Sequence, residues 1–470
     1  MFWENNILVL SNKEKLLLSY LKKIYNMDEI SPLYKAAYYL LQRLWQNSIC
    51  ISMKELHLLV PDFNVDDYEL GKDKPIVFDG EFLYVQRYFV YQTTILKRIE
   101  NLVEKEMLHI ITGGPGTGKT TSLSDILKNE TSKKILLAAP TGKAAFRMTE
   151  SLASKGIYLK AKTIHRLLGY IPFSINFRHN KDKPLDADII AIDECSMIDI
   201  PMMAKLLDAT PENCHLYLLG DKNQLSPVAE GTVFADICKK YMNYGKNIYN
   251  ELTKIYRTDC KGIIELSSMI LNGKVSNFCN DNVTYSPQIS FDDLFAGYNA
   301  LLSTNDVTEA LKYLQEFQVL CAIKNGKNGT KNINKTLLTK AINNGAMYVP
   351  IIITENNYTL NLFNGDVGVR TEKMAYLLVE NEIKEYPLSS LPSYDDAFAI
   401  TIHKSQGSEY KKIAVVYPKE ESENNEQTIF TRELLYTAIT RAKNECLIYG
   451  GEEVLLKSCE RQIHRASGIK

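Results

Sequence analysis

The stretch "ITGGPGTGKTTSL" at residues 111–123 decides the fold class of this chain. Its residues 113–120 fit the pattern G-x-x-x-x-G-K-[ST], after an apolar segment that predicts a strand and before a segment that predicts a helix. Glycines are needed in such a loop because backbone N–H groups must approach phosphate oxygens in conformations that a side chain would block. Lys119 would place a point charge at the β- and γ-phosphates, and Thr120 would give a hydroxyl ligand to Mg²⁺. The sequence therefore predicts an ATP-binding loop made of Gly113, Gly114, Pro115, Gly116, Thr117, Gly118, Lys119 and Thr120.

Two further polar clusters follow predicted strands, where a magnesium-dependent hydrolase needs them. The segment "IIAIDECSMID" at 189–199 places Asp193 and Glu194 at the end of an apolar run. We expect Asp193 to hold Mg²⁺ and Glu194 to polarise the attacking water, because a carboxylate one residue past the metal ligand has that reach. The segment "LLGDKNQL" at 218–225 ends another strand, and its Gln224 is a candidate sensor of the γ-phosphate. A phosphate loop alone would also serve a kinase, a GTPase, a clamp loader or a motor.

Composition places the chain among ordinary soluble globular proteins. Hydrophobic residues make up 45% and charged residues 24%, and no window approaches the roughly 20 apolar residues of a membrane-spanning helix. No secretory signal is visible in the first residues, so we expect a cytoplasmic protein. The nine cysteines include no C-x-x-C pair, which argues against a disulfide framework and a zinc site. With a net charge of −1 the chain as a whole is not basic, so any nucleic-acid contact must come from local grooves.

The spacing of apolar residues along the chain divides the 470 residues into four parts. Residues 1–100 carry helical apolar spacing and predict a mostly helical amino-terminal domain, which we expect to dock a partner or form a cap; the alternative is that its aromatic stripes are simply core. Short apolar strands alternate with helical segments in 101–250 and again in 251–346 and 392–470, which is typical of α/β domains with parallel sheets. Residues 347–391 contain short strands and Asn-Gly turns, which predict a small β barrel. The predicted fold class is α/β, with two RecA-like P-loop domains, a barrel inserted in the second, and a mostly helical amino-terminal domain.

Nine segments occur in the order found in superfamily-one DNA helicases: "GGPGTGKTT", "LAAPTGKAAFRMTESL", "KTIHRLLG", "IDECSMID", "LLGDKNQLSPVAEG", "IYRTD", "LFNGDVGV", "FAITIHKSQGSE" and "LLYTAITRAK". Together they most resemble the RecD family, the α subunits of bacterial exodeoxyribonuclease V, the RecBCD enzyme. The resemblance runs from about residue 108 to the end and, more weakly, through the amino-terminal part. It implies an ATP-dependent 5′–3′ DNA helicase of the bacterial cytoplasm that acts with RecB-like and RecC-like subunits on single-stranded and duplex-end DNA in double-strand-break repair. No nuclease carboxylate cluster is visible, so any cutting would belong to a partner.

The resemblance also implies roles for individual residues. Arg257 and Arg441 would stabilise charge at the γ-phosphate when the two α/β domains close. Gln406 and Gly407 would lie near phosphate, and Glu409 near the ribose. The residues implied to touch single-stranded DNA are Thr141, Lys143, Thr163, His165, Thr401 and His403. Without the resemblance, His165 would be interpreted as a core or capping histidine.

The segment "YIPFSINFRHNKDKP" at 170–184 resembles the pin, a short hairpin with which this family splits a duplex. The alternation of Ile171, Phe173, Ile175 and Phe177 suits a hairpin strand, and an ordinary surface hairpin is the alternative. The chain departs from the family just before the phosphate loop, where relatives have a longer stretch with a glutamine motif that reads adenine. Gln92 lies on a predicted helix and is not expected to replace that glutamine.

Two other functions fit the residues. One is a stand-alone superfamily-one helicase that acts on DNA or RNA without larger partners. The other is a structural subunit that binds nucleotide to hold an assembly together and does not translocate. A motor differs from such a scaffold because its ATPase rises sharply with single-stranded DNA.

Overall fold

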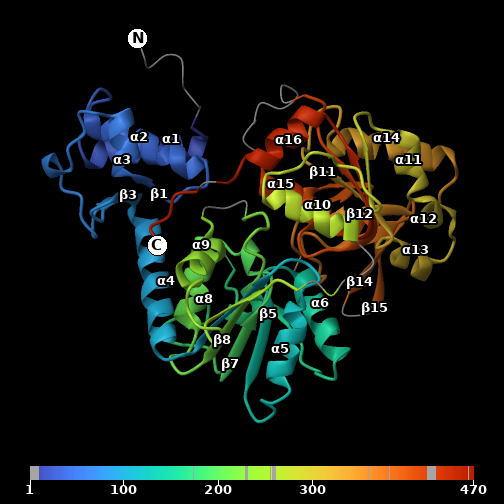
Figure 1. Cartoon of the computed structure of the whole chain (residues 1–470), viewed down its shortest axis with the longest axis horizontal. Helices are drawn as coiled ribbons and strands as arrows, with labels where there is room; N and C mark the ends of the chain where they lie inside the picture. The colour runs from blue at the N-terminus through green and yellow to red at the C-terminus, as the bar shows by residue number, and fades with distance from the viewer. Residues whose placement is uncertain are drawn as a thin grey trace.

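The computed structural model describes residues 10–172, 174–227, 231–254, 256, 261–357, 359–379, 382–420, 430–463 and 465–469. They form an amino-terminal domain, two α/β domains and an antiparallel sheet inserted in the second of these (Figure 1). Among these residues no helix is both long enough and apolar enough to cross a membrane.

The amino-terminal domain combines helices with a small antiparallel sheet of order β1-β3-β2, which the sequence did not predict. Its last helix, α4, reaches along the first α/β domain, and Arg98 Nε of α4 donates to Leu207 O there at 3.0 Å. The predicted boundary at residue 100 therefore falls inside a continuous helix. The elements of this domain are α1 (Asn12–Ile24), α2 (Pro32–Trp45), β1 (Cys50–Ser52), α3 (Met53–Leu59), β2 (Ile76–Phe78), β3 (Phe82–Val85) and α4 (Gln86–Glu104), with a short 3₁₀ turn at Val65–Asp67.

The first α/β domain contains a parallel sheet of order β6-β5-β7-β8-β4-β9. Successive strand residues point to opposite faces, so one face packs on α5 and α6 and the other on α4, α8 and α9. The carboxyl ends of β4, β7 and β8 meet at one edge, which is where open α/β sheets bind ligands. The elements are β4 (Leu108–Gly113), α5 (Lys119–Leu127), β5 (Ile135–Ala139), α6 (Gly142–Ala153), β6 (Lys162–Thr163), α7 (Ile164–Leu168), β7 (Ile189–Ile192), α8 (Ile200–Ala209), β8 (His215–Gly220), α9 (Val233–Tyr241) and β9 (Tyr249–Leu252).

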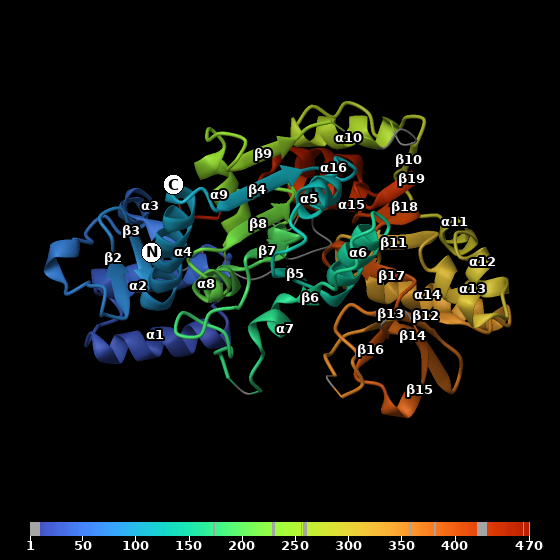
Figure 2. The ribbon, with the colours of Figure 1, turned by 90° about the horizontal axis from the view of Figure 1, so that it is seen from below.

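The second α/β domain repeats this design with a parallel sheet of order β10-β19-β18-β11-β17. Helices α10, α15 and α16 cover one face, and α11 to α14 cover the other. Figure 2 shows α5 and α15 where the two α/β domains meet. The elements are α10 (Lys261–Leu271), β10 (Val283–Ser286), α11 (Phe291–Ala296), α12 (Asn299–Ser303), α13 (Val307–Tyr313), β11 (Phe317–Cys321), α14 (Thr330–Asn343), β17 (Ala399–Thr401), the 3₁₀ turn η4 (Ile402–Ser405), β18 (Tyr410–Val416), α15 (Arg432–Ile439), β19 (Ala442–Tyr449) and α16 (Glu452–Glu460).

The insertion is a five-stranded antiparallel sheet of order β15-β14-β13-β12-β16. It stands where the sequence predicted a barrel, but its last strand ends five residues beyond the predicted boundary at 391. Its small core gathers Ile351, Ile353, Leu362 and Leu377. The strands are β12 (Val349–Ile353), β13 (Val367–Arg370), β14 (Met374–Val379), β15 (Glu382–Pro387) and β16 (Tyr394–Asp396), with a 3₁₀ turn at Leu388–Ser390.

A carboxyl-terminal strap, whose described residues are 461–463 and 465–469, leaves α16 and ends beside the amino-terminal domain and α4 (Figure 1). The backbone N–H of Ile49 donates to Ala466 O at 3.1 Å, and the N–H of Gly468 donates to Gln92 Oε1 at 2.7 Å. Ile469 is buried in the core that the amino-terminal domain shares with the first α/β domain. The strap therefore ties the second α/β domain to the other two.

Candidate active site

The phosphate loop follows β4 and leads into α5, as the sequence predicted. Gly116 and Gly118 have φ of +76° and +85°, a region that favours glycine. A Cβ atom on Gly113 would lie 2.6 Å from both Leu252 O and Thr117 Oγ1, so only a glycine fits there. Lys119 Nζ donates to Gly114 O at 3.1 Å and also to Gly113 O. The loop is thus a cradle of bare backbone around one ammonium group, which fits a bound polyphosphate.

The two predicted carboxylates lie at the end of β7, beside this cradle. Burial and the neighbouring Glu194 raise the pKa of Asp193 above the ordinary value of a carboxyl group. The ammonium group of Lys119 is close enough to oppose this shift. Glu194 adopts φ +54° and ψ +40°, the left-handed conformation, which is rare for a residue with a side chain. Such strain costs on the order of 1–3 kcal/mol and collects at functional positions.

The loop after β8 contacts the second α/β domain directly. The Tyr436 hydroxyl of α15 donates to Asp221 Oδ2 at 2.9 Å, and the Gln224 side chain donates to the same oxygen at 3.3 Å. Leu225 N donates to Thr437 Oγ1 at 2.8 Å, and Gln406 Nε2 donates to Leu225 O at 2.8 Å. Gln224 Oε1 is buried and has no hydrogen-bond partner among the described residues.

Arg441 is buried at the end of α15, where its guanidinium donates to Thr437 O at 3.0 Å and to Ser408 O at 3.2 Å. Gly407 has φ +70° and packs on α6, because a Cβ there would lie 3.5 Å from Ala144 Cβ. Glu409 forms an ion pair with Lys443 at 3.5 Å. The other predicted arginine, Arg257, lies outside the described residues.

Comparison with known proteins agrees with this architecture. The profile of the AAA domain matches residues 97–230, and that of the UvrD-like helicase C-terminal domain matches residues 396–449. The RecBCD enzyme subunit RecD of Mycolicibacterium smegmatis is 33% identical over an alignment of 472 positions, gaps included. The alignment covers 85% of this chain and 84% of that protein. The chain belongs to the RecD family.

Two other known proteins are more distantly similar to this chain. The ATP-dependent RecD2 DNA helicase of Deinococcus radiodurans is 30% identical to this RecD-family chain, over 76% of the chain and 48% of that helicase. The crystal structure of a Pif1 helicase from Bacteroides with ADP-AlF3 and ssDNA has 20% identity and a TM-score of 0.41, and covers 75% of this chain and 91% of that one.

The residues predicted to touch DNA lie at the starts of three elements of the RecD-family chain. Thr141, Thr163 and Thr401 cap α6, α7 and η4, each accepting a hydrogen bond from a backbone N–H three residues later. Their hydroxyls therefore have a structural role in this arrangement. His165 is exposed beside them and packs edge-to-face on Phe177, with ring centres 5.7 Å apart.

Two of the predicted DNA contacts are less open than expected. Lys143 Nζ lies 5.6 Å from the centre of the Tyr410 ring in the contact between the two α/β domains, and burial lowers its pKa to about 7. Asp366 of the insertion opposes that shift. Burial also lowers the pKa of His403 to about 4, and the nearby Arg465 of the strap contributes. At neutral pH the His403 imidazole is therefore neutral, whereas the Lys143 side chain is protonated in part of the molecules.

The described residues of the segment 170–184 contain one antiparallel bridge, between Tyr170 and Phe177, and Ile175 is 73% exposed. The use of this segment as a pin stays a prediction. Phe173 lies outside the described residues. The fold of this segment is set by Arg178, whose N–H donates to Gly169 O, and by contacts of Lys205 with Phe177 and Ile175.

Sequence reasoning missed two aromatic residues at the phosphate loop. The N–H of Tyr256 donates to Gly116 O at 3.0 Å, and its ring would lie 3.7 Å from a Cβ on Gly118. Tyr256 is 65% exposed, and its ring lies beside the cradle with Lys254 Nζ 5.0 Å from the ring centre. The Tyr436 hydroxyl would lie 3.0 Å from a Cβ on Gly114. Tyr256 precedes Arg257 in "IYRTD" and Tyr436 lies in "LLYTAITRAK", so the quoted motifs contained both. Gln92, by contrast, is buried and bonded to Tyr84 and Gly468, away from the cradle.

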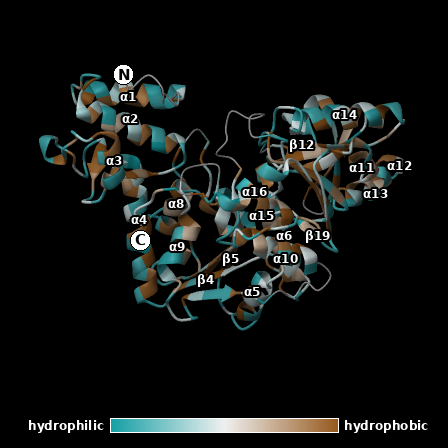
Figure 3. Cartoon of the chain, turned by 45° about the horizontal axis from the view of Figure 1, so that its top comes forward, coloured by the Kyte–Doolittle hydropathy of each residue, from teal (hydrophilic) through white to brown (hydrophobic). Residues whose placement is uncertain are grey.

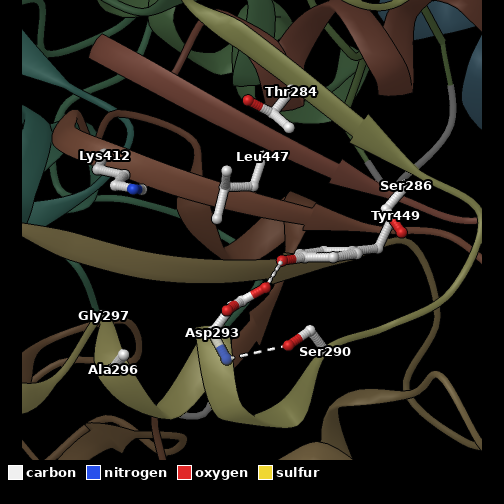
Figure 4. Close-up of a pocket in the computed structure, with 9 residues that line it drawn as sticks. All are labelled: Thr284, Ser286, Ser290, Asp293, Ala296, Gly297, Lys412, Leu447 and Tyr449. Atoms are coloured by element: carbon white, nitrogen blue, oxygen red, sulfur yellow. Dashed lines mark hydrogen bonds between the residues drawn. The ribbon is translucent and has the colours of Figure 1, made fainter.

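One pocket of the described residues is separate from this site. It has a volume of about 510 Å³ and lies against β10, β18, β19 and α11 of the second α/β domain (Figure 4). Asp293 faces it, with Tyr449 donating to Asp293 Oδ2 at 3.4 Å. None of its lining residues belongs to the predicted active site.

Proposed function

We propose that this RecD-family chain is an ATP-dependent 5′–3′ DNA helicase that serves as a RecD-like subunit of a helicase-nuclease complex at double-strand DNA ends. One observation carries the proposal. The Asp221 loop of the first α/β domain is contacted at hydrogen-bond distance by Tyr436 and Thr437 of the second, and the Tyr436 hydroxyl also lies beside Gly114 of the nucleotide cradle. The γ-phosphate would lie between these two surfaces. Its binding and its release would therefore change the position of the second domain relative to the first.

The residues of the cradle suit ATP and Mg²⁺. Lys119 would exchange its bonds to Gly113 O and Gly114 O for phosphate oxygens, which are stronger acceptors. Thr120 and Asp193 would hold Mg²⁺, which when bound neutralises charge on the β- and γ-phosphates. Tyr256 supplies an aromatic surface on which an adenine base can stack, in place of the glutamine motif that the chain lacks.

The groups around the cradle have distinct tasks in hydrolysis. Glu194 accepts hydrogen bonding from the attacking water, and its fixed left-handed backbone aims it. Gln224 has a buried oxygen that a water or a phosphate-bound proton donor can satisfy. Arg441 and Arg257 approach the γ-phosphate as the domains close, where a guanidinium can be worth about 10³- to 10⁵-fold in rate.

Movement along DNA follows from two grips that belong to different domains. Thr141, Lys143, Thr163 and His165 lie on the first α/β domain, whereas Thr401 and His403 lie on the second. Helix starts bind phosphates through free backbone N–H groups, so the three capped starts can hold a strand. Closure around ATP and release after hydrolysis would change the spacing of the two grips by about one nucleotide in each cycle.

The amino-terminal domain is the proposed docking surface for RecB-like or RecC-like subunits. Leu16, Tyr20 and Ile24 follow each other at four-residue spacing on one face of α1 and are 77%, 57% and 45% exposed. Hydrophilic and hydrophobic residues alternate along this helix in Figure 3. Large exposed apolar side chains in a row are typical of protein–protein contacts.

A second candidate is a stand-alone helicase, and the similarity to a RecD2 DNA helicase favours it over a scaffold that binds nucleotide without moving. Strand displacement on duplexes with a 5′ or a 3′ overhang tests the motor, with Lys119→Ala as the inactive control. ATP-dependent unwinding from the 5′ overhang alone is expected. Unwinding from the 3′ overhang alone would overturn the polarity, and an ATPase that single-stranded DNA does not stimulate would favour the scaffold. A monodisperse chain that unwinds DNA and purifies without larger subunits would favour the stand-alone helicase.

A further inference from the structure

Two arginines from different domains bond to consecutive carbonyl groups at the contact between the α/β domains. Arg441 Nη1 of the second domain donates to Ser408 O at 3.2 Å. Arg147 Nη2 of α6, in the first domain, donates to Glu409 O at 3.3 Å. These carbonyl groups belong to two consecutive peptide units, Ser408–Glu409 and Glu409–Tyr410, each of which is planar and which meet at the Glu409 Cα. A contact that holds the Glu409 carbonyl therefore limits how far the backbone at Glu409, and with it the Ser408 carbonyl, can turn.

The segment around Ser408 and Glu409 lies along one face of α6. Gly407 packs against Thr141 and Ala144 at the start of the helix, and Tyr410 lies under Lys143. Arg147 follows Lys143 by four residues, so both cations project from the same side of α6. Helix α6 thus holds the segment at three successive points, and Arg147 is the contact nearest to Arg441.

Electrostatics supports a role for the charge of Arg147. Burial lowers the pKa of its guanidinium, and Arg441 adds to that effect, while Glu409, Tyr410 and Glu194 oppose it. Arg147 is therefore near both the predicted catalytic carboxylate and the predicted finger. A buried guanidinium has a desolvation cost that an apolar side chain of the same length would avoid.

We infer that Arg147 is a positioning residue that aims Arg441 by holding the Glu409 carbonyl, the next carbonyl in the backbone after the one that accepts from Arg441. This inference rests on the proposed function, in which Arg441 acts at the γ-phosphate. Because α6 begins at Thr141, a predicted DNA contact, a shift of α6 on binding a strand would move Arg147, the backbone at Ser408 and Glu409, and then Arg441. Binding of single-stranded DNA would thereby change the rate of hydrolysis through Arg147, without any contact between Arg147 and the nucleotide.

A double-mutant cycle tests this chain of contacts in the full-length protein. The variants are Arg147→Met, Arg441→Ala and the double variant, and the readout is kcat and KM of the ATPase at saturating oligo-dT. Arg147→Met should lower kcat about 10- to 100-fold, because a small misplacement of a catalytic group has effects of that size. The KM for ATP should stay within about twofold, because Arg147 does not contact the cradle. In the Arg441→Ala background the same change should alter kcat by less than about twofold.

Two further variants sharpen the cycle. Arg147→Lys keeps one donor for Glu409 O and should recover most of the lost rate. If Arg147→Met does not fold, as judged by thermal melting, the cycle is run with Arg147→Lys, whose smaller loss should also vanish in the Arg441→Ala background. Lys128→Met removes an exposed cation at the end of α5 and should leave every rate unchanged.

The outcomes separate this inference from the proposed function. An equal loss of kcat in both backgrounds would show that Arg147 acts independently of Arg441 and would overturn the inference. A normal kcat in Arg147→Met beside a slow Arg441→Ala would also overturn it and leave the motor intact. A wild-type protein without DNA-stimulated ATPase would overturn the proposed function itself.

Discussion

The Tyr436 hydroxyl donates to Asp221 Oδ2 at 2.9 Å across the contact between the two α/β domains. The same hydroxyl lies beside Gly114 of the phosphate loop. A single side chain of the second domain therefore contacts the cradle and the loop that follows β8. The hydrogen bond is buried, so water does not compete for it.

Tyr436→Phe should weaken the closed arrangement of the domains by about 1–2 kcal/mol, because a buried carboxylate loses a donor. The DNA-stimulated ATPase should fall as well, since closure places groups of the second domain at the γ-phosphate. Tyr285→Phe is the matched control, because it removes a tyrosine hydroxyl bond within the second domain, to Gly450 O at 3.2 Å. The control should alter the melting temperature without altering kcat, and equal kcat losses in both variants would contradict the interpretation.

Glu194→Gln should bind ATP with nearly normal affinity and stop turnover. The amide keeps the size of the side chain and can stay in the left-handed conformation, but it cannot take a proton from the attacking water. Fluorescent-nucleotide binding and steady-state hydrolysis measure the two effects separately. Glu212→Gln, an exposed glutamate of the same domain, is the control. Turnover at the wild-type rate in Glu194→Gln would refute the assignment of the base.

Lys119→Ala should abolish ATP hydrolysis without unfolding the protein. Its ammonium group now bonds only to loop carbonyl groups among the contacts described, so its loss removes charge from the cradle and leaves the core intact. Circular dichroism should match the wild type while hydrolysis falls to background. Residual hydrolysis above about one hundredth of the wild-type rate would argue against a direct phosphate contact.

Asp236→Asn should stabilise the protein at neutral pH and lose that advantage in acid. Burial raises the pKa of Asp236 to about 6, while hydroxyl donors of Ser467 and Thr232 and the charge of Lys239 oppose the shift. The folded state therefore binds the proton more tightly than the unfolded state, and wild-type stability falls as pH rises from about 4 to about 6. At pH 7.5 the variant should be more stable by about 1–3 kcal/mol.

Chemical denaturation at pH 4.5 and 7.5 measures this difference for Asp236→Asn. Asp182→Asn, at an exposed position, is the control and should change the free energy of unfolding by less than about 0.5 kcal/mol. A variant that is less stable than the wild type at both pH values would mean that the strap contact through Ser467 needs the carboxylate charge.

Gly468→Ala should loosen the carboxyl-terminal strap. A Cβ there would lie 2.4 Å from the Tyr84 hydroxyl and 2.5 Å from Gln92 Nε2, so the strap has to shift away from α4. We expect a loss of about 1–3 kcal/mol in the free energy of unfolding and faster proteolysis after residue 460. Unchanged proteolysis would indicate that Gly468 is not what holds the strap.

Much of the fold was predictable because it depends on local pattern. The strand before the phosphate loop and the strands ending near Asp193 and Asp221 all formed where the apolar runs predicted them. The family membership predicted from nine ordered motifs is confirmed. The roles of the individual site residues, including Arg441 and Gln224, stay predictions.

Other features were not predictable, because they depend on which distant residues meet. The sequence did not indicate that the Lys143 ammonium group lies over the ring of Tyr410, a residue more than 260 positions later in the chain. The alternating residues of 170–184 did not indicate which of them would pair, and the structure pairs Tyr170 with Phe177. The small sheet of the amino-terminal domain escaped notice because two of its strands have only three residues.

The sequence by itself determined the phosphate loop, the carboxylates that follow the strands and the family, because each of these rests on residues close together in the chain and on chemistry that tolerates few substitutes. Only the tertiary structure decided that Tyr436 meets Asp221, that Arg147 and Arg441 bond to consecutive backbone carbonyl groups, and that the strap closes on Gln92. These contacts join segments separated by up to several hundred residues. Their partners are selected by the packing of whole domains, which no local pattern records.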